Sequence, residues 1–295
     1  MKQFRHIVII LRADRMTGAV LLALSLLFSA LLFSSHSALC GDELTFAVFG
    51  DSRPGRDFKQ PPVFSTIIDS MKELPLDAVF HTGDVIYGKT EDPANIGRQY
   101  DSFFKIVKNL KPPIHVAAGN HDIWSEASAA IFRKQFGYLY TSVTLGENRF
   151  ILLNSELPLN ECRIDGEQLA WLEKELRRSQ RESRNIFIIL HRPMFPTNRY
   201  VGKSMDKFPD ERDRLHSLFK KYGVRFVFSG HEHIYNRTEK DGIAYIVTGG
   251  GGAELYADED KGGVHHFLLF TVKGKEIHFE LRIIHKDGTI ERKDP

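Results

Sequence analysis

The stretch Phe80–Tyr87, with the sequence FHTGDVIY, is the one around which this chain is organised. Leu76–Phe80 is a short apolar run that predicts a buried strand, and Gly83 permits a sharp turn directly after it. Asp84 is therefore expected at the carboxyl end of a strand, which is where open α/β sheets bind their ligands. A carboxylate at that position can bridge two cations.

Four other apolar runs also predict buried strands, and each ends in residues that suit metal binding. If the ends of all these strands converge at one sheet edge, their side chains form a single site. These candidate ligands are Asp51 after Leu44–Phe49, Asn120 after Ile114–Ala118, His191 after Asn185–Leu190, and His231 and His233 after Arg225–Ser229.

The donor types indicate which metals such a site would bind. Carboxylate, amide and imidazole groups suit zinc, manganese and iron. A thiolate site is excluded, because the chain has only two cysteines, Cys40 and Cys162. If Cys40 leaves with the signal or carries lipid, Cys162 is unpaired and no disulfide framework exists. Two metals bridged by Asp84 would form the centre of a two-metal hydrolase. His231 and His233 point the same way only from an extended backbone, which favours binding to a common centre.

The segments between these runs predict an α/β fold. Amphipathic helices are expected at Pro62–Lys72, Asn95–Leu110, residues 125–137 and Asp210–Tyr222. A further helix is expected to begin at Asp165, which with Gln168 three residues on predicts a capping box. Thr141–Leu145 and Arg149–Asn154 predict a strand pair, and Ile243–Thr248, His266–Thr271 and Glu276–Ile284 predict antiparallel strands. Arg192–Pro209 is expected as a long surface loop beside the site, and Gly249–Gly252 as a flexible connector.

Length and charge limit the possible functions. The chain has 295 residues and a hydrophobic share of 42%, enough for one large core, and no linker divides residues 41–295. The net charge of +2 is uneven: residues 1–40 carry four basic residues against one acidic residue, which leaves about one net negative charge on the remainder. Such a body has no electrostatic footprint for nucleic acid.

The first forty residues predict an export signal or a membrane anchor. A basic segment ends at Arg15, and a sixteen-residue apolar run, Gly18–Phe33, follows it; this run is short for a membrane span. Three outcomes stay open: cleavage after Cys40 with Gly41 as the first mature residue, retention as an anchor, or lipidation of Cys40. Each places the body in the periplasm or outside the cell, with membrane attachment in the last two.

Five motifs in this chain, in their order and spacing, resemble those of calcineurin-like metallophosphoesterases. The resemblance implies a four-layer α/β/β/α metallophosphoesterase sandwich with mixed sheets, whose loops carry a dinuclear metal site. The motifs are Gly50-Asp51, Gly83–Tyr87, Gly119–Asp122, His191 and Gly230–His233.

Two departures from the common family pattern favour the purple acid phosphatase branch. The usual first motif is Asp-x-His, but Arg53 occupies the histidine position. Tyr87 follows Asp84 by three residues, as does the iron-binding tyrosine of purple acid phosphatases. Gly230–Arg237 and the glycine-rich connector are similar to that branch as well.

The resemblance also implies a role for each site residue. A hydroxide between the ions would attack phosphorus, His121 would donate a proton to the leaving oxygen or stabilise phosphate charge, and Asp122 would orient the His121 ring. Arg53, Asn120 and His121 would contact the substrate. The site would hold two divalent or mixed-valence metal ions, iron together with zinc or manganese. One would bind Asp51, Asp84, Tyr87 and His233, and the other Asp84, Asn120, His191 and His231.

The sequence thus predicts an exported, metal-dependent phosphoesterase that acts on small phosphomonoesters. Phosphodiesters or nucleotides are alternative substrates, and a catalytically silent, metal-binding interaction scaffold is an alternative function. Simpler structural roles stay open for single residues: Asp51 and Asp84 as turn residues, Tyr87 as a packed ring, and Arg53 as a surface charge. His115, His265 and His266 are expected to be core or surface residues without a site role.

Overall fold

The structure is a computed structural model that describes residues 43–295. The predicted export signal or anchor, residues 1–40, lies outside the described residues. The described residues, 43–295, belong to one compact unit. Among residues 43–295, no helix combines the length and the apolar character needed to cross a membrane.

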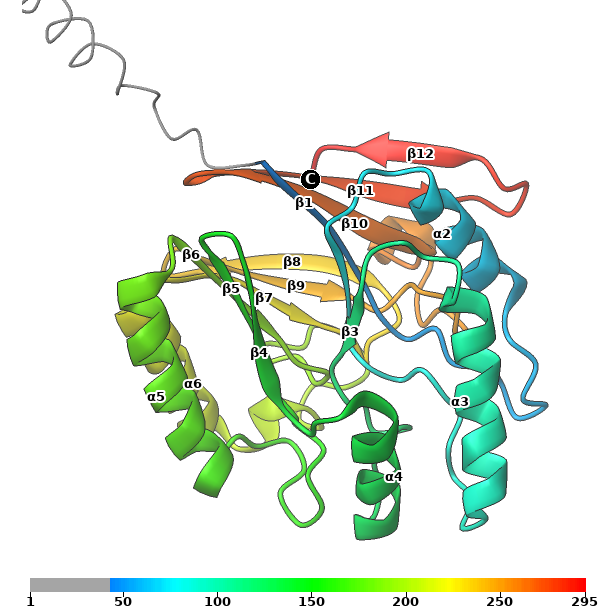
Figure 1. The fold of residues 1–295 in the computed structure, drawn as a ribbon, viewed down its shortest axis with the longest axis horizontal. Helices are drawn as coiled ribbons and strands as arrows, with labels where there is room; N and C mark the ends of the chain where they lie inside the picture. The colour runs from blue at the N-terminus through cyan, green and yellow to red at the C-terminus, as the bar shows by residue number, and fades with distance from the viewer. Residues whose placement is uncertain (1–42) are drawn as a thin grey trace, which may run out of the picture. The chain divides into compact units, whose positions relative to one another are not determined.

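The strands of this unit form two six-stranded sheets (Figure 1). In sheet A, β1, β2 and β3 run parallel, and β10, β11 and β12 continue the sheet antiparallel. Sheet A is therefore mixed. Its order is β12 (Ile290–Lys293), β11 (Glu276–Ile284), β10 (His266–Lys273), β1 (Leu44–Phe49), β2 (Ala78–His81), β3 (Ile114–Val116).

Sheet B is also mixed. Four of its strands, β5, β6, β7 and β9, are parallel, and β4 and β8 pair antiparallel at its two edges. Its order is β4 (Thr141–Leu145), β5 (Asn148–Leu152), β6 (Asn185–Ile189), β7 (Val224–Ser229), β9 (Ile243–Thr248), β8 (Tyr235–Lys240).

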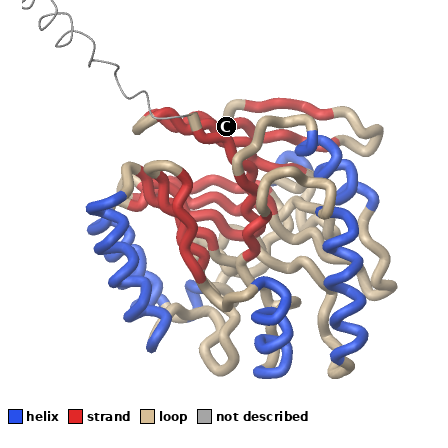
Figure 2. Tube along the Cα trace, in the orientation of Figure 1, coloured by secondary structure: helices blue, strands red, loops and turns tan. Residues whose placement is uncertain are grey.

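Helices cover the outer face of each sheet, as Figures 1 and 2 show. One buried apolar cluster joins sheet A to its helices, and another joins sheet B to α5 and α6. The arrangement is helix, sheet, sheet, helix, so the predicted four-layer α/β/β/α sandwich is confirmed. The helices are α2 (Pro62–Lys72), α3 (Pro93–Val107) and α4 (Glu126–Phe136) on sheet A, and α5 (Gly166–Glu182) and α6 (Pro209–Tyr222) on sheet B.

A third apolar cluster fills the space between the two sheets. Phe46 on β1 is fully buried there, and its ring lies 4.9 Å from the rings of both Phe270 and Phe150 and 5.3 Å from that of Phe187, measured between centroids. Phe270 belongs to sheet A, whereas Phe150 and Phe187 belong to sheet B. Aromatic packing between the sheets therefore fixes the position of one sheet on the other.

The helix boundaries follow local signals in the sequence. Ser125 caps α4 by accepting a hydrogen bond from the backbone of Ser128, and Gly137 ends the helix with a φ of 85°. The predicted capping box at the start of α5 does not form, since the Asp165 side chain makes no capping hydrogen bond. Gln168 instead bonds both backbone groups of Asn154, at 2.7 and 2.9 Å, and holds the loop after β5.

Two predictions about the second half of the chain were wrong, and two strands were missed. Ile243–Thr248 forms β9, which is fully buried and parallel to β7, and it pairs antiparallel only with the edge strand β8. Tyr235–Lys240 and Ile290–Lys293 form edge strands that no prediction included; both are polar, as edge strands commonly are. Gly249–Gly252 is a buried connection, where a side chain on Gly251 would meet the Gly50 carbonyl.

The predicted loop at Arg192–Pro209 is present but partly folded into the protein. It contains the short 3-10 helix η1 (Met205–Lys207), and Met194 and Met205 join the cluster beneath α5 and α6. A second short 3-10 helix, η2 (Glu259–Lys261), lies before β10. Met194 and Met205 thus hold the two ends of the loop against the protein, and its first residue follows His191 directly.

Candidate metal centre

The predicted ligands meet where strand ends of the two sheets face one another. Asp51, Asp84 and Asn120 follow β1, β2 and β3 of sheet A, whereas His191 follows β6 and His231 and His233 follow β7 of sheet B. The predicted convergence is present, but it involves two sheets and not one sheet edge. These six residues are called the candidate centre below.

The backbone at three of these residues adopts a conformation that is uncommon outside glycine. Asp51, Asp84 and His231 have φ values of 59°, 60° and 68°. Left-handed backbone at a residue with a side chain costs free energy, and such residues cluster at functional sites. A turn role alone explains an aspartate in this conformation, but it does not explain why all three side chains point into one cluster.

Two glycines allow the strand ends to approach closely. Gly83 has a φ of 103°, and a Cβ atom there would lie 2.7 Å from the Gly119 nitrogen. A Cβ atom on Gly119 would lie 2.2 Å from Asp84 Oδ1. Since both contacts are shorter than real Cβ contacts, the Asp84 carboxylate can take its place only beside glycine.

Sheet A presents its carboxylates through backbone hydrogen bonds. Asp51 accepts the His231 backbone N–H at 3.2 and 3.0 Å, and Asp84 accepts the His121 backbone N–H at 2.9 Å. Both carboxylates are buried, with exposed fractions of 0% and 2%. Burial alone would raise the pKa of Asp84, but the nearby charges of His191, His121 and Arg53 lower that pKa well below its usual range.

Sheet B presents imidazole nitrogens to these carboxylates. His191 Nε2 lies 3.4 Å from Asp84 Oδ1, and His233 Nε2 lies 3.3 Å from Asp51 Oδ1. In both rings the other nitrogen, Nδ1, donates to a backbone carbonyl, that of Thr82 for His191 and that of Glu254 for His233. In a neutral ring Nε2 then carries a lone pair and faces the carboxylates, as in metal-binding histidines.

The donor set fits a cation. Ligand atoms of Asp51, Asp84 and His191 all lie within 4.8 Å of one another, and the three side chains are buried. Asn120 Oδ1 adds an oxygen 3.1 Å from His191 Nε2. Oxygen and nitrogen acceptors gathered this closely repel one another unless a positive charge lies among them. Oxygen and imidazole donors together suit zinc, manganese or iron.

His231 is placed differently from the other two histidines. Its Nδ1 lies 3.2 Å from His191 Nε2, and its Nε2 lies 3.2 Å from Nη1 of Arg192. A guanidinium can only donate, and a neutral imidazole that accepts at Nε2 carries its proton on Nδ1. His231 therefore fits a metal through Nδ1 only if the contact with Arg192 opens.

Neighbouring residues hold His121 and Asp122 in the loop after β3. The backbone carbonyl of Tyr87 accepts from His121 Nδ1, and this contact orients the ring. Asp122 is fully buried and accepts the backbone N–H groups of Asp84 and Gly119 at 2.7 and 2.8 Å. Asp122 thus supports the Asp84 turn, and the orientation of the His121 ring that was expected from Asp122 comes from Tyr87.

Arg53 and Tyr87 lie at the edge of the centre. Arg53 Nε is 3.5 Å from Asp84 Oδ2, and its guanidinium carbon is 5.9 Å from the centroid of the Tyr87 ring. The Tyr87 ring also packs near Phe58 and His121, at centroid distances of 5.8 and 5.5 Å. Arg53 is more than a surface charge, while metal binding by Tyr87 stays a prediction.

Several residues beside the centre escaped the sequence analysis. Arg192 donates through Nε to both oxygens of the buried Glu156 carboxylate, at 2.9 Å each. Its position directly after His191 was the available signal. The Tyr256 ring stacks on His233 with centroids 3.8 Å apart, and no sequence pattern marks this tyrosine. His81 Nδ1 accepts the Gly83 N–H at 3.1 Å and so supports the turn before Asp84.

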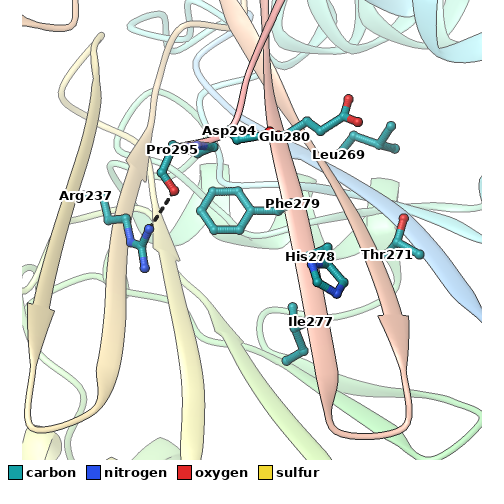
Figure 3. Close-up of a pocket in the computed structure, with 9 residues that line it drawn as sticks. All are labelled: Arg237, Leu269, Thr271, Ile277, His278, Phe279, Glu280, Asp294 and Pro295. Atoms are coloured by element: carbon teal, nitrogen blue, oxygen red, sulfur yellow. Dashed lines mark hydrogen bonds between the residues drawn. The ribbon is translucent and has the colours of Figure 1, made fainter.

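Two pockets differ in their relation to the centre. The first, about 520 Å³, lies beside β8, β10 and β11, where Arg237 donates to the Pro295 carbonyl at 2.8 Å (Figure 3). None of the six residues of the candidate centre lines it. A second pocket, about 410 Å³, includes Arg53 and Tyr256 and so adjoins the centre.

Known proteins match this chain in sequence and in fold. The sequence profile of the family described as calcineurin-like phosphoesterase matches residues 44–235. Acid phosphatase type 7 of Mus musculus is 27% identical over 248 residues, which cover 70% of this chain and 54% of that protein. The protein named probable inactive purple acid phosphatase 27 of Arabidopsis thaliana is 27% identical over 295 residues, covering 77% and 47%.

A solved structure matches as well. Purple acid phosphatase PPD1 from yellow lupin seeds superposes with a TM-score of 0.68 at 22% identity, covering 85% of this chain and 53% of that one. The chain spans about half the length of the curated relatives named above. These matches confirm the resemblance that the five motifs indicate, and the structural match confirms the fold.

Proposed function

Because the chain belongs to the calcineurin-like phosphoesterase family, we propose that it hydrolyses phosphomonoesters with the help of two metal ions at the candidate centre. The observation that carries this proposal is the position of Asp84. Its carboxylate lies within 4.8 Å of both the Asp51 and the His191 ligand atoms, between donors from the two sheets. A carboxylate placed in this way can serve two ions.

The residues divide into two overlapping ligand groups. When bound, the ions supply Lewis acidity toward the phosphoryl oxygens and a nucleophile formed from water. The mixed oxygen and nitrogen donors suit iron together with zinc or manganese. One group would contain Asp51, Asp84, His233 and, as the family resemblance implies, Tyr87. The other would contain Asp84, Asn120, His191 and, once its contact with Arg192 opens, His231.

His121 is suited to contact the reacting phosphate group. Its backbone N–H holds Asp84 and its Nδ1 is engaged by the Tyr87 carbonyl, so Nε2 is the ring atom left for the substrate. Because Nδ1 carries the proton donated to the Tyr87 carbonyl, the ring would have to be protonated at both nitrogens to give a proton from Nε2 to the leaving oxygen. Asp122 is a positioning residue: its carboxylate accepts the backbone N–H of Asp84 and so holds Asp84 in place.

Arg53 and Asn120 would orient the phosphate. The Arg53 side chain is 15% exposed, and its Nε contacts Asp84 Oδ2 at 3.5 Å, so the guanidinium lies at the rim of the centre. Guanidinium groups bind phosphate oxygens through paired N–H donors. The Asn120 amide oxygen faces His191, which leaves its amide nitrogen for a substrate oxygen.

The test compares p-nitrophenyl phosphate with bis-p-nitrophenyl phosphate, using the full chain in detergent with zinc, manganese and iron supplied in turn. The proposal predicts turnover that is lost on chelation, with the monoester preferred. Preference for the diester would instead identify a phosphodiesterase. Stoichiometric metal binding without turnover of either ester would favour a silent interaction scaffold.

We also propose that the protein is exported and acts outside the cytoplasm, attached to the membrane where residues 1–40 are retained or lipidated. The support is the basic segment followed by the apolar run Gly18–Phe33. Cell fractionation with the intact chain, and N-terminal sequencing of the product, would distinguish cleavage, lipidation and retention. Recovery of the uncleaved chain only in the cytosol would contradict the proposal.

A further inference from the structure

The pocket of about 410 Å³ beside the candidate centre contains two arginines. Arg53 connects it to the centre through its contact with Asp84. Arg199, from the loop after β6, lines the same pocket, together with Gly252, Glu254 and Tyr256. Its volume is within the range of small-molecule sites.

The Arg53 guanidinium has donors to spare. Nε has no hydrogen-bond partner within residues 43–295, and Nη1 makes one long contact, 3.4 Å, with the neighbouring Pro54 carbonyl. A guanidinium has five N–H donors. Since its side chain is mostly buried, the donors that Asp84 and Tyr256 leave free can be satisfied by a ligand or by water in the pocket.

Arg199 is held by stacking and not by charge pairing. Its guanidinium carbon lies 4.2 Å from the centroid of the Tyr256 ring. In the part of the chain that the structure describes, Arg199 makes no ion pair and no hydrogen bond. A guanidinium that lies over an aromatic face keeps N–H donors available for a ligand.

Tyr256 links Arg199 to the centre. One stacked contact joins the Tyr256 ring to His233, at 3.8 Å and an interplanar angle of 14°, and the Arg199 contact is with the same ring. The pocket therefore lies one aromatic ring away from a predicted metal ligand. A molecule whose phosphate occupies the centre would extend its other end into this pocket.

The charge of the pocket favours an anion. Two guanidinium groups line it against one carboxylate, that of Glu254, which is exposed and forms no ion pair with either arginine in residues 43–295. Arg53 pairs with Asp84 of the centre, so the uncompensated positive charge of the pocket is that of Arg199. Paired guanidinium groups recognise carboxylate and phosphate through parallel N–H donors.

We infer that this pocket binds a second anionic group of the substrate. The substrate class is then a phosphomonoester whose alcohol part carries a carboxylate or another phosphate. This inference rests on the proposed function, because it assumes that the scissile phosphate occupies the candidate centre.

The test uses matched substrate pairs that differ in the second anion. β-Glycerophosphate and 2-phosphoglycerate differ by a carboxylate, and fructose 6-phosphate and fructose 1,6-bisphosphate differ by a phosphate. For each pair the ratio of kcat/KM values measures the preference for the second anion. We expect a ratio of about ten in the metal-loaded full chain, the effect of a charged hydrogen bond, and the pair with the larger ratio identifies the preferred anion.

Arg199→Gln should reduce this ratio toward one. Arg177→Gln is the matched control, because Arg177 on α5 is exposed, as Arg199 is, and lies outside the pocket. The ratio of kcat/KM values for this variant should equal that of the wild type. Ratios near one for both pairs in the wild type, or a ratio that Arg199→Gln leaves unchanged, would overturn the inference.

Failure of the proposed function gives a different result. In that case the wild type would hydrolyse none of these esters and no p-nitrophenyl phosphate with any metal. Calorimetric titration of the metal-loaded protein with 2-phosphoglycerate and β-glycerophosphate then decides about the pocket. Tighter binding of 2-phosphoglycerate that Arg199→Gln abolishes supports the inference, and equal binding of both compounds overturns it.

Discussion

The two sheets contribute to the candidate centre in different ways. Sheet A supplies oxygen donors, and at Asp51 and Asp84 its backbone is left-handed. Sheet B supplies imidazoles, of which only His231 has a left-handed backbone. Each half depends on the other: Thr82 of sheet A orients the His191 ring, and the His231 backbone holds the Asp51 carboxylate. Neither sheet alone forms the site, so the packing of one sheet on the other determines its geometry.

The largest loss of activity is expected when the Asp84 carboxylate, which both ligand groups share, is removed. Asp84→Ala should reduce kcat/KM by more than the ~100-fold that follows the loss of a residue behind a metal ligand. Asp69→Ala on α2 is the control, because this exposed aspartate pairs with Lys72 and with no other charged group in residues 43–295. Hydrolysis of p-nitrophenyl phosphate measures both variants, and wild-type turnover by Asp84→Ala would refute the shared role.

The next largest effect should come from loosening the contact between the sheets. Phe46→Ala removes a fully buried ring that packs on aromatic rings of both sheets. We expect a loss of about 3–5 kcal/mol in the free energy of unfolding. Denaturant unfolding measures it, with Leu159→Ala as the control, since Leu159 is 88% exposed. A loss no greater than that of the control would show that the sheets are held together elsewhere.

A third contact between the sheets should make stability depend on pH. His266 of sheet A is fully buried, and its Nε2 lies 3.0 Å from Thr248 Oγ1 of sheet B. Burial lowers the pKa of His266 from 6.5 to about 4, with a smaller lowering from His265 and an opposing effect of the Val264 carbonyl. Tyr235 packs against the same ring.

The sign of the effect follows from this pKa. Between pH 6.5 and pH 4 the unfolded chain binds a proton at His266 that the folded protein does not, so stability decreases as the pH falls through this window. The slope contributed by His266 is up to about 1.4 kcal/mol per pH unit. In the His266→Gln variant the free energy of unfolding should depend less steeply on pH in this window. The comparison is between slopes, so it holds even if the variant is less stable than the wild type at every pH. Equal slopes for the two proteins would contradict the assignment.

The smallest effect concerns Tyr87, at the rim of the sheet A half. If Tyr87 binds iron, Tyr87→Phe should abolish a visible phenolate-to-iron absorption band while changing the free energy of unfolding by less than about 0.5 kcal/mol. Tyr140→Phe is the control, because Tyr140 packs against Trp171. An iron-loaded wild type without this band would leave Tyr87 as a packing residue beside Phe58 and His121.

The candidate ligands can be found in the sequence because they follow local signals. An apolar run gives the strand, a glycine gives the turn, and the polar residue after it takes the strand end, as at Gly83 and Asp84. Which strands pair is not a local property. For that reason the division of the centre between two sheets was missed, and so was the parallel pairing of Ile243–Thr248, which is buried on both faces.

The residues that shape the substrate side have little or no signal in the sequence. Tyr256 and Arg199 lie in polar loops, and their contact depends on where the loops meet after folding. The strand Tyr235–Lys240 lies at the edge of sheet B and is polar, as edge strands commonly are. It therefore lacks the alternation of apolar and polar residues that would predict a strand. Arg192 is the exception, since it follows His191 directly.

In the proposed centre, the two sheets together bind two metal ions. Anomalous diffraction from crystals of the full chain grown with manganese and then with zinc tests it directly. We predict two peaks, one near Asp51, Asp84 and His233 and the other near Asp84, Asn120 and His191. A metal-saturated crystal with no peak at the candidate centre, or with peaks contacting residues of only one sheet, would contradict the account.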